Sequence, residues 1–141
     1  MRPTGTPIGL RLALTAKVVS REFNDVLTEA GGSLPVWLVL SSLKSEHRHT
    51  QLDLARAVGI EGPTLTRHLD SLEESGLVVR KRDSADRRAV RVELTDAGER
   101  LHQALLKAAI GFNKRLTAGM SEQELARLQR SLEQLAQNVQ P

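Results

Sequence analysis

The sequence predicts a mainly α fold with a small β element, which places the chain in the α+β class. Three observations support this prediction. Apolar residues recur at three- and four-residue intervals over most of the chain, and a single short segment near residue 90 alternates between apolar and polar side chains. Glycine or proline separates most of the helical segments. With 141 residues, of which 40% are hydrophobic, the chain is long enough for one domain with a core and for helices that associate with a partner.

Residues 1–46 are predicted to form two helices that serve as a scaffold and as a dimerisation segment. Helical spacing runs from Leu12 to Ala30, and two glycines end the helix because glycine accepts the left-handed conformation beyond a helix terminus. Ser33 is placed to cap the second helix, which has Pro35 in its first turn.

Two shorter helices joined by a glycine turn are predicted to follow, at the start of a second region that spans residues 47–95. Thr50 and Asp53 have a spacing close to that of a capping box, and Gly59 ends the helix that they open. Pro63 suits the first turn of the next helix. The buried stripe of that helix is predicted to consist of Leu65, Leu69 and Leu72.

A β-hairpin with a basic tip is predicted to complete this region. Residues 77–82 form the first strand, and residues 89–94 alternate, with two valines and a leucine on one face. The connection, residues 83–88, reads DSADRR and is polar and turn-prone. Residues 80–91 hold six basic and two acidic side chains, a local excess of four that exceeds the net charge of +3 of the whole chain. This concentration of positive charge favours a polyanionic partner.

Residues 96–141 are predicted to form two further amphipathic helices. Thr95 is placed to cap the first, and Ser121 with Glu124 has the spacing of a capping box for the second. The apolar residues of the last helix have the spacing of an interhelical seam. They are Leu125, Leu128, Leu132, Leu135 and Val139. We therefore expect the terminal helices to form the dimerisation layer of a homodimer.

A helix, a glycine turn, a second helix and a basic hairpin are, in this order, the elements of a winged helix-turn-helix, whose second helix enters the major groove of double-stranded DNA. The predicted architecture is a winged helix-turn-helix with N- and C-terminal dimerisation helices. Arginine donates two hydrogen bonds to guanine, and threonine contacts phosphate or a thymine methyl group. The predicted DNA-contacting residues of the second helix are Pro63, Thr64, Thr66, Arg67 and His68.

The predicted hairpin tip offers arginines to the minor groove. An arginine on a narrow loop suits the negative potential of an A·T-rich minor groove. Phosphate would repel Asp86, so we expect this carboxylate to hold a neighbouring arginine and to shape the turn.

The segment DSADRRAVRVELTDAGE resembles the wing of the MarR family of bacterial transcription regulators, with Asp-Arg-Arg, an alternating strand, and Leu-Thr followed by a glycine. The overlapping segment LDLARAVGIEGPTLTRHLDSLEESGLVVRKRDSADRRA is similar to the SlyA branch of that family. The resemblance is strong over residues 50–99 and weaker in the flanking helices. It implies a homodimeric regulator with interlocked terminal helices, in which two winged modules read successive major-groove halves of a pseudo-palindromic operator.

The resemblance also implies roles for single residues. Pro63, Thr64 and Arg67 match recognition-helix positions, and Arg87 matches the wing-tip position that enters the minor groove. Arg88 and Asp86 match the pair that braces the wing. The expected phosphate contacts are Thr50, Gln51, Arg80 and Arg82.

Many relatives in this family bind small phenolic or carboxylate compounds in a cleft between the dimer helices and the DNA-binding module. By the resemblance, a cleft for such an effector would be lined by Leu12, Lys17, Trp37 and Ser41. Where SlyA-like relatives offer an imidazole one turn after the tryptophan, this chain has Ser41, so a ligand would need a different polar anchor. A single tryptophan at helical spacing is also typical of a packed core, and this alternative stays open.

Several other functions lack support in the sequence. The chain has no cysteine, which excludes disulfides and thiolate chemistry. No segment approaches 18 uninterrupted apolar residues and no export signal is evident, so we expect a cytoplasmic protein without a membrane span. The four histidines are interpreted as solvated loop side chains: His47, His49, His68 and His102.

Catalysis is also not expected. His47 and His49 would share one face of a strand, but no third metal ligand follows them. Neither a phosphate-binding glycine loop nor a nucleophile arrangement is recognisable. We therefore expect no metal, no cofactor and no enzymatic activity. The alternative function left open is a winged-helix module that binds an acidic protein with the same basic surface.

Overall fold

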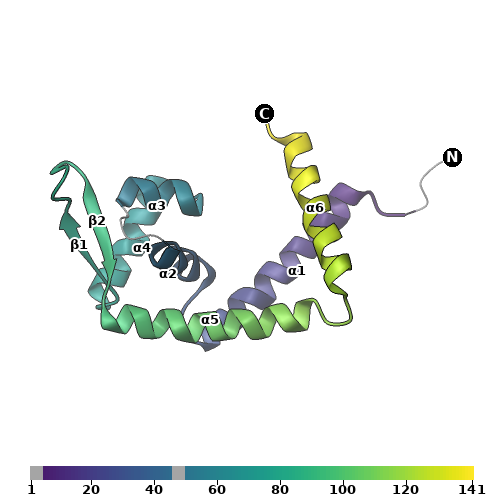
Figure 1. The fold of residues 1–141 in the computed structure, drawn as a ribbon, viewed down its shortest axis with the longest axis horizontal. Coiled ribbons are helices and arrows are strands. Elements are labelled where there is room, and N and C mark those ends of the chain that lie inside the picture. Colours follow the sequence, from purple (N-terminus) through teal and green to yellow (C-terminus); the bar gives the residue numbers. More distant parts are fainter. Residues whose placement is uncertain (1–4, 46–49) are drawn as a thin grey trace. The chain divides into compact units, whose positions relative to one another are not determined.

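The computed structural model describes residues 5–45 and 50–141, and within them it contains six helices and one antiparallel sheet of two strands (Figure 1). The chain divides into two compact units, Met1–Ala109 and Ile110–Pro141. This composition confirms the predicted mainly α class with a small β element.

The elements of the first unit follow in the predicted order. They are α1 (Ile8–Glu29), α2 (Leu34–Ser45), α3 (Gln51–Val58), α4 (Gly62–Glu74), β1 (Val78–Arg82), β2 (Val90–Leu94) and most of α5 (Asp96–Leu116). The second unit holds the end of α5 and α6 (Glu122–Val139). α1 begins four residues before the predicted Leu12, directly after Pro7, whose carbonyl accepts the first helical hydrogen bond from Arg11.

The helix-turn-helix is closed by local hydrogen bonds that the sequence predicts. Thr50 Oγ1 accepts a hydrogen bond from the Asp53 N–H at 3.1 Å, and the Asp53 carboxylate accepts one from the Thr50 N–H at 3.4 Å, which completes the capping box of α3. Gly59 ends α3 with a φ of +67°, a conformation that favours glycine. These two ends fix where the turn before α4 begins.

The core of the first unit is built mainly from leucines that several helices contribute. α4 buries its predicted stripe, and the hairpin adds Val78 and Val92. Around them, α2, α3 and α4 lie together beside the hairpin (Figure 1). The fully buried leucines are Leu27, Leu40, Leu54, Leu65, Leu69 and Leu105. α4 and the hairpin are therefore both anchored in one core.

The base of the hairpin is tied to the start of α5. Thr95 Oγ1 donates to the Gly76 carbonyl at 2.6 Å and accepts from the Gly98 N–H at 3.1 Å, which confirms Thr95 as a helix cap. α5 passes so close to the hairpin that a Cβ at Gly98 would lie 2.1 Å from the Leu77 carbonyl oxygen. Any side chain at position 98 would clash with this carbonyl, which explains the glycine of the Leu-Thr-x-x-Gly signature.

The last helix departs from the prediction at its cap. Ser121 Oγ accepts a hydrogen bond from the Glu124 N–H at 3.1 Å, but the structure shows only this half of the expected capping box. The apolar seam of α6 is exposed in the single chain, with Leu128 at 43% and Leu132 at 42%.

Over residues 5–45 and 50–141, no single helix has both the length and the hydropathy of a membrane span. α1 and α2 reach these values only when taken together, and the chain bends by 75° between them.

Candidate nucleic-acid interface

The predicted reading residues lie in the first half of α4, opposite its buried leucines. Pro63 and Arg67 are exposed, whereas Thr64 and His68 are half-buried. His68 lies on α4, the helix on which it was predicted as a DNA contact, so it is not one of the loop histidines. Because the leucine stripe holds the other face of α4 in the core, this half of the helix has a fixed orientation towards solvent.

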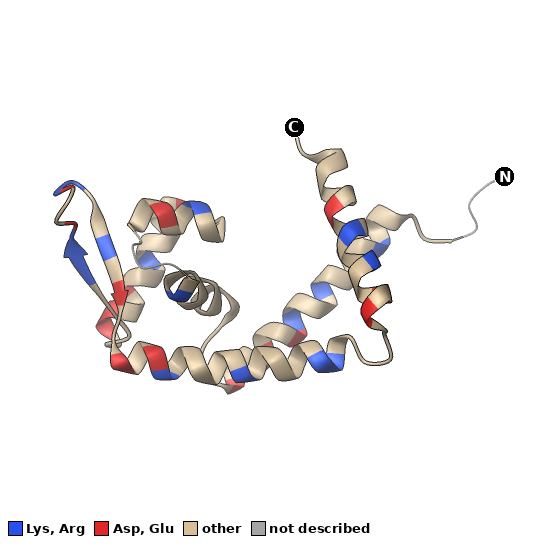
Figure 2. Cartoon of the chain, viewed as in Figure 1, with Lys and Arg blue, Asp and Glu red and all other residues tan. Residues whose placement is uncertain are grey.

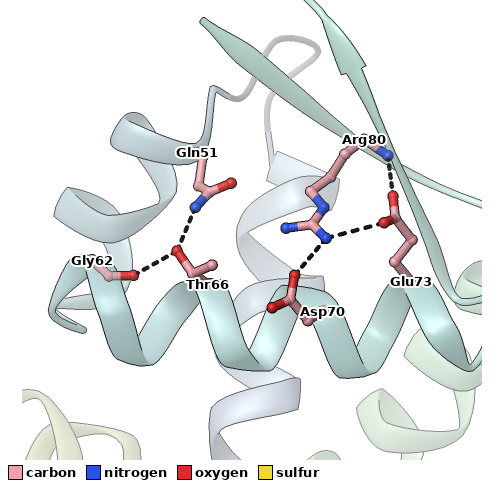
Figure 3. A network of polar contacts seen from close by, with 6 residues as sticks. All are labelled: Gln51, Gly62, Thr66, Asp70, Glu73 and Arg80. Atoms are coloured by element: carbon pink, nitrogen blue, oxygen red, sulfur yellow. Dashed lines mark hydrogen bonds and ion pairs between the residues drawn. The ribbon is translucent and has the colours of Figure 1, made fainter.

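Thr66 is engaged within the protein (Figure 3). Its hydroxyl donates to the Gly62 carbonyl at 2.9 Å and accepts from the Gln51 side-chain amide at 2.8 Å. A hydrogen bond from Thr66 to a phosphate would require its only donor to leave Gly62. Gln51 and Thr66, which the sequence predicts as two separate DNA contacts, therefore join the start of α3 to the first turn of α4.

The hairpin tip is shaped by its two aspartates. Asp83 Oδ1 accepts from the Ala85 N–H at 2.9 Å, and Asp86 Oδ1 accepts from the Arg88 N–H at 3.0 Å. Asp86 thus holds the neighbouring Arg88 through the backbone N–H of that arginine. The consequence is a tip whose acidic groups are turned to the loop backbone.

Positive charge gathers along β1 and at the tip of the hairpin (Figure 2). Glu93 pairs with Lys81 at 3.4 Å and with Arg91 at 3.3 Å. Within the described part of the chain, the remaining exposed guanidinium groups of this surface have no ion-pair partner. They are Arg67, Arg82, Arg87 and Arg88. Exposed arginines without an ion-pair partner are free to neutralise the phosphates of a polyanion.

Arg80 differs from these arginines because α4 holds it. Its Nη2 group binds the carboxylates of Asp70 and Glu73, the latter at 3.0 Å, and its side chain is only 21% exposed. The hydrogen bond from the Arg80 side chain lowers the pKa of Glu73, and the same bond, followed by the one to Asp70, raises the pKa of Arg80. The phosphate contact predicted for Arg80 would require it to leave these carboxylates.

A hollow of about 500 Å³ lies between the start of α3 and the wing. Its lining includes Thr50 and Gln51, which are predicted phosphate contacts, and Arg88, which is predicted to brace the wing. Asp53 and Asp86 also line it, and both take part in the hydrogen bonds described above. The fold therefore brings the predicted phosphate contacts of α3 to the same side as the wing.

An imidazole that the sequence did not identify lies beside Trp37, one of the residues predicted to line an effector cleft. The Trp37 ring stacks on His102 of α5, with centroids 5.4 Å apart and planes inclined by 14°. His102 is buried, so the interpretation of His102 as a solvated loop residue is wrong. Its pKa is lowered, first by burial and then by Lys44, while Glu99 opposes the shift.

Among the residues that the structure describes, two buried polar atoms on these helices have no hydrogen-bond partner: Ser41 Oγ on α2 and His102 Nδ1 on α5. Lys44 and Glu99 join the same two helices by an ion pair of 2.9 Å. The other predicted cleft residues, Leu12 and Lys17, lie on α1 and are exposed.

No group of three His, Asp or Glu side chains in residues 5–45 and 50–141 is placed to hold a metal ion. His47 and His49, the pair considered from sequence, lie outside the described residues.

Comparison with known proteins gives this geometry a context. A model of the MarR family matches residues 33–90. The solved structure of the transcriptional regulator PA3341 is 36% identical, covers 94% of this chain and 98% of that chain, and superposes with a TM-score of 0.80. A point mutant of MarR from E. coli in complex with operator DNA is 25% identical, with coverages of 92% and 93% and a TM-score of 0.83. The transcriptional repressor CouR bound to a 23-mer DNA duplex is 27% identical, with 92% of each chain covered and a TM-score of 0.85.

Proposed function

This chain belongs to the MarR family of DNA-binding transcription regulators, and we propose that it acts as a homodimer that binds a pseudo-palindromic operator. The observation that carries this proposal is the pairing of an exposed amino-terminal half of α4 with unpaired guanidinium groups on the adjacent wing. We also place the chain in the SlyA-like branch, on the similarity of residues 52–89, and in the cytoplasm.

In the proposed complex, α4 enters the major groove and the wing enters the flanking minor groove. Arg67 reads base edges, with Pro63, Thr64 and His68 beside it, and Arg87 occupies the minor groove. The Asp86–Arg88 turn holds the tip in shape. The proposed phosphate contacts are Thr50, Gln51 and Arg82. The relatives solved with operator DNA and with a DNA duplex support this placement by their fold.

The homodimer is proposed on the exposed apolar faces of the terminal helices. In α1, Leu10 and Leu14 are 52% and 53% exposed, and α6 leaves its leucine seam uncovered as described above. A second copy of the chain would cover such faces, and it would set two recognition helices at the spacing of two operator half-sites.

Selection of duplexes from a random pool tests the function directly. We expect an inverted repeat with half-sites about one helical turn apart. Affinity for this duplex should exceed that for a scrambled control and should fall steeply with salt, because phosphate contacts release counterions. A pool without enrichment would reject sequence-specific binding and would favour the alternative of an acidic protein partner.

We further propose that a small phenolic or carboxylate compound modulates operator binding. The supporting observation is the pair of unpartnered polar atoms, Ser41 Oγ and His102 Nδ1, on the helices that carry the Trp37–His102 stack. Because Trp37 is the only tryptophan, titration with hydroxybenzoate should change its fluorescence and weaken operator binding over the same concentration range. Unchanged fluorescence and unchanged operator affinity would contradict modulation by this class of compound.

A further inference from the structure

The recognition helix is held to its neighbours at both ends of its length. Near its start, the Gln51 amide binds Thr66, and near its end, Asp70 and Glu73 bind Arg80 of β1 (Figure 3). The first contact fixes α4 against α3. The second is the polar link that connects α4 to the wing.

The link to the wing uses both the side chain and the backbone of Arg80. One Glu73 oxygen accepts from the guanidinium and the other accepts from the Arg80 N–H, each at 3.0 Å. Asp70, three residues before Glu73 and therefore on the same side of the helix, accepts a further hydrogen bond from the guanidinium. A carboxylate that binds two different groups of one residue restrains both its position and its rotation.

Arg80 sits where such a restraint has the most effect on the wing. It is the middle residue of β1 and pairs with Val92 of β2. A hairpin of two strands has little stability by itself, so its direction depends on what it is fastened to. The base is fastened by Thr95, and Arg80 fastens the middle, beyond which the chain runs unbraced by α4 to the tip.

We propose, on the basis of the DNA-binding function above, that Arg80, Asp70 and Glu73 form a positioning clamp that sets the angle between the recognition helix and the wing. With the clamp closed, α4 and the Arg87 tip reach the major groove and the minor groove of one half-site together. Arg80 contributes to minor-groove readout without contacting DNA.

When the carboxylates are removed, net charge alone predicts higher affinity for both kinds of flank and an unchanged flank preference, whereas the clamp predicts a lower flank preference. The variant Asp70→Ala/Glu73→Ala opens the clamp and also deletes two negative charges from a helix that faces phosphate. If only net charge mattered, DNA affinity would rise. If the clamp positions the wing, the preference for A·T flanks falls although the surface becomes more positive. Alanine is the best helix former, so α4 itself is retained.

The DNA experiment compares operators with A·T and G·C flanks around one core. For the clamp variant we expect the flank preference to fall by roughly a factor of 3 to 10, and Arg87→Ala to have little further effect in that background, since coupled residues are non-additive. The matched control Glu61→Ala/Glu74→Ala also deletes two charges at α4 but leaves Arg80 paired, and it should keep the parent's preference. Parental preference in the clamp variant, or independent effects of clamp and Arg87, would overturn the proposal.

A measurement without DNA separates failure of the clamp from failure of the proposed function. The chain has no cysteine, so spin labels at Ala85→Cys and Ser71→Cys report the distance between wing tip and α4, with labelled chains diluted in unlabelled protein. The distance distribution should be narrow in the parent and the control, and broad in the clamp variant. Equal distributions would overturn the clamp, whereas a parent without any DNA preference would reject the proposed function and leave this distance to decide the clamp.

Discussion

The winged module and the terminal helices use the same leucine-rich periodicity with different results. In the module, Leu54, Leu65 and Leu69 are fully buried within one chain. In the terminal helices, Leu10, Leu128 and Leu132 leave between two fifths and about half of their surface exposed. The module buries its core within one chain, with the help of Leu27 of α1, Leu40 of α2 and Leu105 of α5. The exposed apolar faces of the terminal helices, by contrast, would be covered by a second chain. The winged module can therefore take its shape within a single chain, whereas association of the terminal helices would need a second chain.

The largest expected effect comes from making the terminal helices unable to associate. Leu128→Asp/Leu132→Asp places two carboxylates in the seam of α6, and the chain should then sediment as a monomer. Operator affinity should fall by about 100-fold or more, because the avidity of two linked half-sites is lost. The control Gln123→Asp/Gln137→Asp adds the same charge outside the seam and should stay dimeric. A dimeric Leu128/Leu132 variant would contradict the role of the seam.

Within the module, the largest effect is expected at Arg67. Arg67→Ala should cost about 1 to 3 kcal/mol in binding to the selected operator and should relax the choice of one base pair. Arg56→Ala, which removes an exposed arginine from α3, serves as the control and should preserve base choice. Affinities for the operator and a scrambled duplex measure both outcomes, and equal losses on the two duplexes would exclude a direct reading role.

A smaller effect is expected at the wing tip. Arg87→Ala should cost about 1 kcal/mol, the lower end of the range for a direct contact, and should remove most of the preference for A·T flanks. The thermal unfolding temperature should not change, because the side chain is exposed and the turn is held by Asp86. A variant that still discriminates between flanks like the parent would show that another residue enters the minor groove.

The smallest expected effect concerns stability and pH at His102. Its folded pKa lies below the ordinary value of 6.5, so as the pH falls below 6.5 the unfolded chain gains a proton that the folded chain resists. The free energy of unfolding should therefore decrease with falling pH in this window. Urea unfolding of the parent and His102→Asn across this range isolates the contribution. A slope that is identical in both proteins would contradict the assignment.

Local signals predicted the fold well, and contacts between distant residues account for what they missed. The capping box at Thr50, the leucine stripe of α4 and the glycine after α3 each depend on neighbours within a few residues. The Trp37–His102 stack joins residues on two helices, and no local pattern identifies such a partner.

In the candidate site, too, features that depend on neighbours in sequence were predicted and contacts between distant residues were not. The exposed face of α4 and the basic tip follow from periodicity and composition, as predicted. The partners of Thr66 and Arg80 do not, because both lie on elements whose packing decides which polar groups meet. The three-residue spacing of Asp70 and Glu73 indicates that both carboxylates lie on one side of a helix and could bind a cation. It does not identify which basic residue of the hairpin is their partner.

The stoichiometry of the complex tests the central claim most directly. Sedimentation velocity of the 141-residue chain, alone and mixed with the selected duplex, measures how many chains associate and how many bind one operator. A dimer in solution and two chains on each inverted repeat, with no stable complex of one chain, is the predicted result. A monomer that binds a single half-site with undiminished affinity would contradict the claim that the exposed faces of the terminal helices need a partner chain for operator binding.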